Sequence, residues 1–174
     1  GTAAPGSYPV KSNPQITVAG ISSLYQINMA YTDFNIASRT VTRTLYAPPV
    51  RTGRAFAHII EEVYIYRGTA WAGSSGITTV NAAVGVDNLL GGATDVDALI
   101  VDSDLSSSGG TFIGTSAAEK GNLLNSGPTA LVMPGGTYET VTITIDSGSG
   151  KTCNNLTAGT CQVIIKYWEI PTLT

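Results

Sequence analysis

The side chains that could carry chemistry in this chain are few, and its single histidine, His58, is the natural starting point. His58 lies in the dense apolar run 55-AFAHIIEEVYIYRG-68, where we expect a structural role, and a Ser-His-Asp triad has no other histidine to use. Glu61 and Glu62 are consecutive in the same expected strand, so they should face opposite sides and cannot flank one substrate as a glycosidase pair does. We therefore predict that the chain is not an enzyme and needs no cofactor.

Aspartates in the stretch 95-DVDALIVDSD-104 are the plausible metal-ligand cluster. Calcium takes about six to eight oxygen ligands, and Asp-x-Asp spacing with nearby carbonyl groups in a loop supplies several. The sequence lacks an Asp-x-Asp-x-Asp-Gly loop, however, and solvated turn residues explain the aspartates equally well. We predict no metal site, with the following Ca²⁺ candidates kept open: Asp95, Asp97, Asp102 and Asp104.

The two cysteines of the chain, Cys153 and Cys161, lie near its carboxyl end. The alternating strand 137-TYETVTITID-146, the loop 147–159 and the apolar run 160-TCQVIIKYWEI-170 predict a terminal hairpin with both cysteines at its mouth. A reduced pair suits the inside of a cell, but this placement favours a bridge in an oxidising medium. We predict a Cys153–Cys161 disulfide and, with it, a location outside the cell.

Tryptophans and tyrosines raise the alternative of carbohydrate binding. Trp71, in 68-GTAWAGSSG-76, is expected at a loop tip and is a candidate ligand contact. Trp168 follows Tyr167 in the last expected strand, where it suits the core or a subunit interface.

Turn signals recur between β-rich runs at the spacing typical of a sandwich or jelly roll. We predict an all-β fold, a single-domain antiparallel β-sandwich of jelly-roll type with about eight strands. Residues 1–22, with several prolines, form an extended amino-terminal arm, and residues 23–174 form the sandwich domain. Residues 88–134 are rich in Gly, Ser and Asp and predict a long connection with one or two short strands and a helical turn near 116–121.

The run 55–68 is apolar on both faces of its expected strand. Its odd positions suit the core, but its even positions are also large, so we expect that face to be covered by a second sheet or a neighbouring subunit. Low charge also suits permanent assembly, since such surfaces repel their neighbours weakly. The predicted interface residues are Phe56, Ile60, Tyr64, Tyr66 and Trp168.

Composition argues against two classes of partner. With 9 Lys+Arg against 12 Asp+Glu, the chain lacks the basic field that attracts nucleic acid. No apolar run reaches the roughly 18–20 residues that cross a bilayer, and the amino end lacks signal-peptide features, so we expect a soluble chain whose leader, if any, is already removed.

Four segments resemble small jelly-roll virion proteins of tailed bacteriophages: 31-YTDFNIASRTVTRTLYAPP-49, 59-IIEEVYIYRGTAWAG-73, 84-VGVDNLL-90 and 156-LTAGTCQVIIKYWEIP-171. Such sequences run from a "t.tl..lp" strand through "I..v.v....F.G", a "VG" strand and an Asp-rich loop to a closing "lTaG...i.i.Y" strand. The resemblance spans residues 31–171. This chain departs from it by placing Trp71 where Phe is usual and by its cysteines.

The resemblance implies a virion component, such as a capsid decoration, head-fibre or tail protein. It would be a homo-oligomer, with a trimer favoured, bound to other virion proteins and with a host-surface glycan as a further candidate partner. The alternatives are a secreted pilus or fibre subunit that assembles by strand exchange through its amino-terminal arm, and a carbohydrate-binding module.

Overall fold

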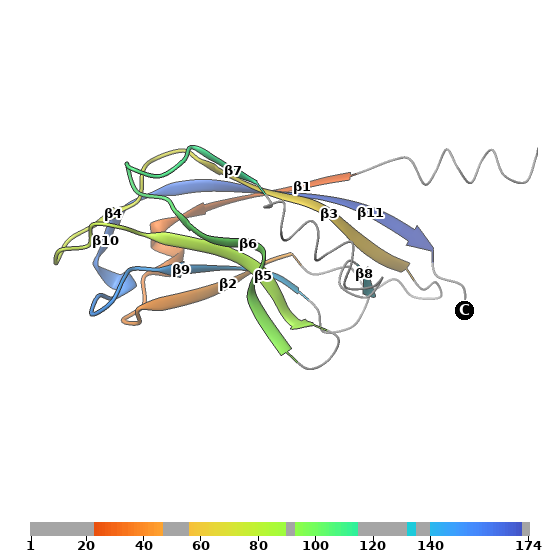
Figure 1. The fold of residues 1–174 in the computed structure, drawn as a ribbon, viewed down its shortest axis with the longest axis horizontal. Helices are drawn as coiled ribbons and strands as arrows, with labels where there is room; N and C mark the ends of the chain where they lie inside the picture. The colour runs from red at the N-terminus through yellow and green to blue at the C-terminus, as the bar shows by residue number, and fades with distance from the viewer. Residues whose placement is uncertain (1–22, 47–55, 90–92, 115–131, 135–139, 172–174) are drawn as a thin grey trace, which may run out of the picture.

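The fold is given by a computed structural model, which describes residues 23–46, 56–89, 93–114, 132–134 and 140–171. These residues form strands, connecting segments and short 3-10 turns, with no α-helix among them (Figure 1). The 3-10 turns cover Tyr31–Phe34 and Cys153–Asn155. The strands are β1 (Ser23–Ala30), β2 (Thr40–Tyr46), β3 (Phe56–Arg67), β4 (Ala72–Gly73), β5 (Asn81–Leu89), β6 (Ala93–Asp104), β7 (Phe112–Gly114), β8 (Val132–Pro134), β9 (Thr140–Asp146), β10 (Leu156–Ala158) and β11 (Thr160–Pro171).

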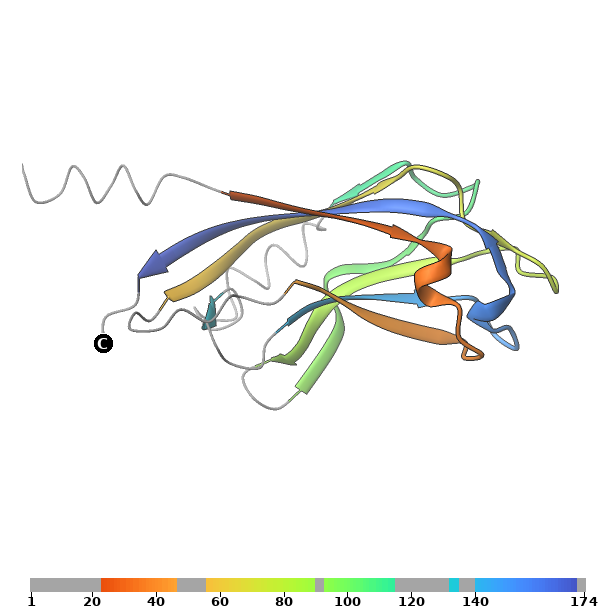
Figure 2. The same ribbon diagram turned by 180° about the vertical axis from the view of Figure 1, so that it is seen from behind.

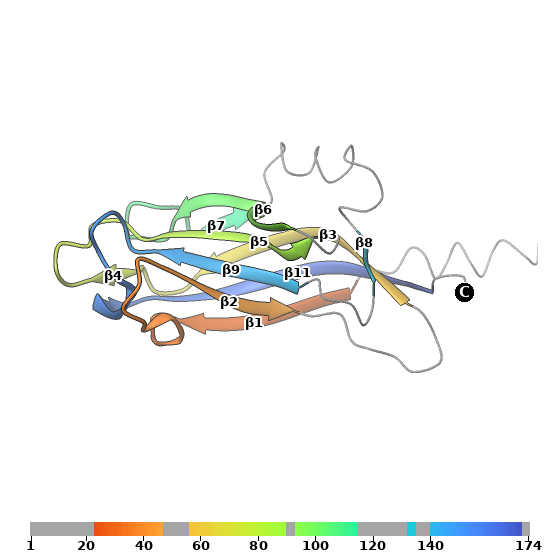
Figure 3. The same ribbon diagram turned by 90° about the horizontal axis from the view of Figure 1, so that it is seen from below.

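The strands form two packed layers, which we call the first and the second sheet. The first has the order β1-β11-β3-β7, with β8 also paired to β3, and the second has the order β2-β9-β5-β6. Figure 3 shows the strands of the second sheet side by side in that order. Every pairing is antiparallel, including the small β10–β4 pair. The predicted all-β antiparallel sandwich is confirmed.

The pairing of strands is nested along the chain. β1 pairs with β11, β2 with β9, β3 with β7 and β5 with β6. The chain changes sheet between β1 and β2 through the 3-10 turn Tyr31–Phe34, at one end of the sandwich (Figure 2). Most contacts therefore join residues far apart in sequence.

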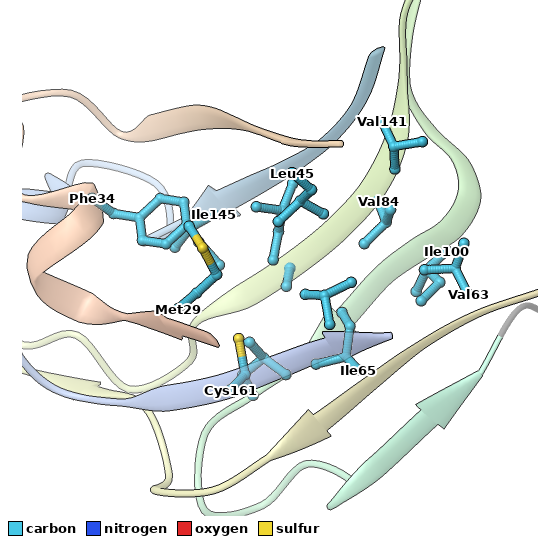
Figure 4. Close-up of a cluster of buried hydrophobic side chains, with 14 of the residues drawn as sticks. Met29, Phe34, Leu45, Val63, Ile65, Val84, Ile100, Val141, Ile145 and Cys161 are labelled. Atoms are coloured by element: carbon cyan, nitrogen blue, oxygen red, sulfur yellow. The ribbon is translucent and has the colours of Figure 1, made fainter. Parts of the chain in front are cut away.

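The core lies between the inner faces of the two sheets (Figure 4). β9 shows the expected alternation, with Val141, Ile143 and Ile145 fully buried. β5 does likewise with Val84 and Val86. Facing them from the first sheet are four buried residues of β3 and β11, namely Val63, Ile65, Val163 and Ile165.

The predicted long connection over residues 88–134 is wrong for β6, which is a strand of 12 residues. Val84 pairs with Ile100, but Val86 pairs with Asp95, so β6 carries extra residues between these pairs. This bulge turns both Leu99 and Ile100 into the core. Because the buried residues of β6 do not alternate simply, the sequence pattern did not predict this strand.

The predicted terminal hairpin is also wrong. β9 lies in the second sheet and β11 in the first, so residues 147–159 cross between layers. The crossing segment is held by backbone hydrogen bonds, from Cys153 N to Ser38 O at 2.8 Å and from Asn154 N to Ile36 O at 3.0 Å. Its start is fixed by Arg39, which donates two hydrogen bonds to Asp146 at 2.9 and 2.7 Å.

Some expectations fall outside the described residues: the arm 1–22 and the helical turn near 116–121. Within the described ranges, no helix has the length and hydrophobicity required to span a membrane.

Candidate functional site

The outer face of the first sheet carries an exposed group of apolar and aromatic side chains. The register places Tyr64 beside Ile164, and Tyr66 between Gln162 and Phe112. Leu24, Tyr66 and Phe112 are 61%, 50% and 58% exposed. Monomeric proteins rarely leave large contiguous apolar patches open to water. We call the following residues the outer aromatic face: Leu24, Tyr64, Tyr66, Phe112 and Ile164.

Tyr64 is held in place by two contacts on this face. Its ring stacks on that of Phe112, with centroids 5.1 Å apart and planes 22° from parallel. Its hydroxyl donates a hydrogen bond to Glu62, and this bond, with burial, raises the pKa of Tyr64 to about 12. Tyr64 therefore stays neutral at physiological pH and presents a fixed apolar ring edge.

The predicted interface is corrected at Ile60, which is 2% exposed and belongs to the core. Lys166 pairs with Glu62 but Tyr167 pairs with Ile60, so β3 has one extra residue, Glu61, at this point. The bulge reverses which positions point inward. Tyr64 and Tyr66 face outward as expected, whereas the side chains of Phe56 and Trp168, in β3 and β11, lie outside the described part of the structure.

The same bulge corrects the expectation that Glu61 and Glu62 face opposite sides. Glu61 forms an ion pair with Lys166 at 3.2 Å, and Glu62 accepts the hydrogen bond from Tyr64. Both carboxylates therefore contact outer-face side chains.

Trp71 is not a ligand contact, because it is 1% exposed. Its ring meets Phe34 edge-on with centroids 5.7 Å apart, and Gly159 lies directly against it. The indole N–H has no hydrogen-bond partner among the described residues. The Gly- and Ser-rich setting of Trp71 predicted a loop tip, but the residue closes one end of the core.

The predicted Cys153–Cys161 disulfide is wrong, since both cysteines are free and buried. Cys153 lies in the crossing segment, where its thiol is 3.2 Å from the carbonyl oxygen of Arg39. Cys161 lies in β11 opposite Met29 (Figure 4). Burial raises the pKa of both thiols, that of Cys161 to about 12, so neither is a reactive thiolate at neutral pH.

Intact-mass measurement on freshly purified protein should show two free thiols under non-reducing conditions. A thiol reagent should label neither cysteine rapidly in the native state, because both are buried, and should label both after denaturation. A native mass lower by two hydrogens would contradict the structure.

The aspartates of β6 are spread along the strand, with Asp95 opposite Val86 and Asp104 opposite Asn81. Asp104 accepts hydrogen bonds from Ser106 N at 2.7 Å and Ser108 Oγ at 2.8 Å, and its pKa is lowered by these bonds although desolvation opposes them. No group of three potential metal ligands occurs among the described residues. Thus Asp95, Asp97, Asp102 and Asp104 are not brought together.

His58 pairs with Glu169 and Met133 through the backbone of β3.

The residues that sequence reasoning missed on the outer face are Leu24, Phe112 and Ile164. Period-two alternation in 160-TCQVIIKYWEI-170 puts Ile164 on the outer face of the strand, so its position was predictable from the sequence. Phe112 follows a Gly- and Ser-rich stretch and gave no comparable signal.

Comparisons with known proteins show no family. No family model and no curated protein matches the chain. A chain from the structure of infectious bursal disease virus, Gx strain, is similar to it at 7% identity with a TM-score of 0.19, over 88% of this chain and 42% of that one. The present chain thus spans less than half the length of that viral chain.

Proposed function

We propose that the chain is a non-enzymatic structural subunit of a virion, a capsid decoration, head-fibre or tail component that assembles with copies of itself. A trimer is the favoured state, and the assembled protein would be located in the virion or outside the cell. The nested strand pairing supports the jelly-roll topology that the sequence resemblance implies. The observation that carries the proposal is the exposed outer aromatic face.

The chemistry of this face suits a protein partner. Tyr64 and Phe112 form a stacked pair, and the neighbouring Glu62, Lys166 and Gln162 supply a polar border. Aromatic side chains bordered by polar groups are typical of the central residues of protein interfaces. A second copy that covers the face would remove Tyr66 and Phe112 from water.

Phe112→Asp should yield folded single chains where the wild-type protein forms oligomers. The change places a charge within the covered face, and a charge that stays unpaired there costs about 2–5 kcal/mol. Light scattering after size exclusion gives the mass, and circular dichroism confirms the fold. Tyr64→Asp, on the same face, should act alike.

Thr44→Asp is the matched control, because Thr44 is an exposed residue of β2 on the outer side of the second sheet. It should leave the oligomer intact. Recovery of the wild-type mass from both Phe112→Asp and Tyr64→Asp would refute assembly through this face.

A pilus or fibre subunit that assembles by strand exchange is the alternative, and one observation favours it. Among the described strands, β1 lies at an edge of the first sheet, and none of them pairs with the outer side of its backbone. If deletion of residues 1–22 abolishes assembly while Phe112→Asp does not, strand exchange is the better account.

A further inference from the structure

A groove opens on the first sheet where β1 and β3 end and β11 begins. Its volume is about 510 Å³, within the range of roughly 300–1,000 Å³ found for small-molecule sites. Three of its lining residues are small: Ala30, Gly68 and Thr160. A Cβ at Gly68 would lie 2.7 Å from the hydroxyl of Thr160, so a larger residue at position 68 would crowd Thr160.

Among the described residues that line the groove, Tyr66 supplies an aromatic ring, and Asn28 and Gln162 supply side-chain amides. Tyr66 is half exposed. Gln162 Nε2 donates to Asn28 Oδ1 at 3.1 Å, which leaves Gln162 Oε1 as an acceptor and Asn28 Nδ2 as a donor beside each other. Exchanging the orientation of both amides would again leave one donor and one acceptor.

Asp33 adds a carboxylate to the rim of the groove. One of its oxygens, Oδ2, accepts the backbone N–H of Ala30 at 2.7 Å, and the other remains an acceptor. Among the described residues that line the groove there is no lysine or arginine, and Asp33 is the acidic residue. The charge therefore disfavours phosphate, sulfate and carboxylate ligands.

We propose that this groove binds a neutral pyranose sugar. A pyranose has a face of C–H groups that can pack on the ring of Tyr66, and vicinal hydroxyls that each donate and accept hydrogen bonds. The free amide atoms of Asn28 and Gln162 match one such pair of hydroxyls, and Asp33 can accept from a third. The inference goes beyond the proposed assembly, and a second copy that covers Tyr66 would close the groove to sugar.

The test is a titration of ¹⁵N-labelled protein with glucose, galactose, mannose and N-acetylglucosamine, followed by amide chemical shifts. At least one of these sugars should give saturable shifts centred on Asn28, Gly68, Thr160 and Gln162. Glucuronic acid should bind more weakly than glucose because of Asp33. The titration is made on the wild type and on Phe112→Asp, so that a groove covered by assembly is distinguished from a groove that binds no sugar.

Variants of the groove then test its chemistry. Tyr66→Ala and Gln162→Ala should each weaken binding about tenfold, whereas Tyr66→Phe should keep it because the ring remains. Val101→Ala is the control, since Val101 is an exposed apolar residue of β6 that does not line the groove. The proposal is overturned if no neutral sugar saturates either protein, or if Tyr66→Ala and Gln162→Ala bind as the wild type does.

Discussion

Gly159→Ala should destabilise the protein strongly, by roughly 2–4 kcal/mol. The residue has a φ of +140°, where a side chain is strained. A Cβ there would also lie 2.6 Å from Cγ of the Trp71 ring, which is packed against Phe34 and cannot retreat. Denaturant unfolding measures the loss, and thermal unfolding should show a fall of about 2–4 °C for each kcal/mol.

Gly148→Ala separates the two causes. Gly148 also has a positive φ, +95°, but a Cβ there meets nothing within 4 Å. It should cost only the backbone strain, about 1–3 kcal/mol, and less than Gly159→Ala. Equal losses in the two variants would show that contact with Trp71 does not constrain Gly159.

Gly85→Ala should have a comparably large effect for a different reason. Gly85 has ordinary extended backbone in β5, but a Cβ there would lie 2.6 Å from Cα of Val96 and closer still to the carbonyl oxygen of Asp95. These are backbone atoms of the β6 bulge, so β6 itself must move. We expect a loss of about 1–3 kcal/mol or more.

Hydrogen exchange locates the damage in Gly85→Ala, because amides of β6 should exchange faster while those of β1 and β11 keep their protection. Gly110→Ala, where the atom nearest to a Cβ is 3.7 Å away and φ is not positive, is the control for this readout and should leave β6 unchanged. If the β6 amides of Gly85→Ala keep the wild-type protection from exchange, the bulge does not require glycine at position 85.

Regular strands were predictable from the sequence and bulged strands were not. In β9 and β5 the expected inward residues, Ile143 and Val84 among them, are buried. In β2, a register shift turns both Leu45 and Tyr46 inward, and in β3 the extra residue Glu61 turns Ile60 inward. One added residue reverses the facing of all that follow, and period-two reasoning cannot locate it.

The predicted disulfide fails because two segments that are close in sequence need not be neighbours in a sheet. The segment between β9 and β11 has the turn residues of a hairpin loop, but it changes layers, and alternation within each strand carries no information on which sheet the strand joins. Burial of Trp71 depends likewise on two distant elements, Phe34 and Gly159, which no local pattern links to it.

The candidate surface was predictable in part. Tyr64 and Tyr66 were expected on a face that something covers, and they do point away from the core of their own chain. Phe112, which completes the stack with Tyr64, comes from β7, and only the long-range pairing of β3 with β7 brings it there.

The most direct test of the central claim is hydroxyl-radical footprinting of the wild-type protein at concentrations below and above its assembly, with the mass followed by light scattering. Assembly through the outer aromatic face predicts that Tyr66 and Phe112 lose reactivity as the mass rises. Tyr25 and Ile36, which are 37% and 43% exposed away from that face, should react equally in both states. An increase in mass with unchanged reactivity of Tyr66 and Phe112 would contradict the account.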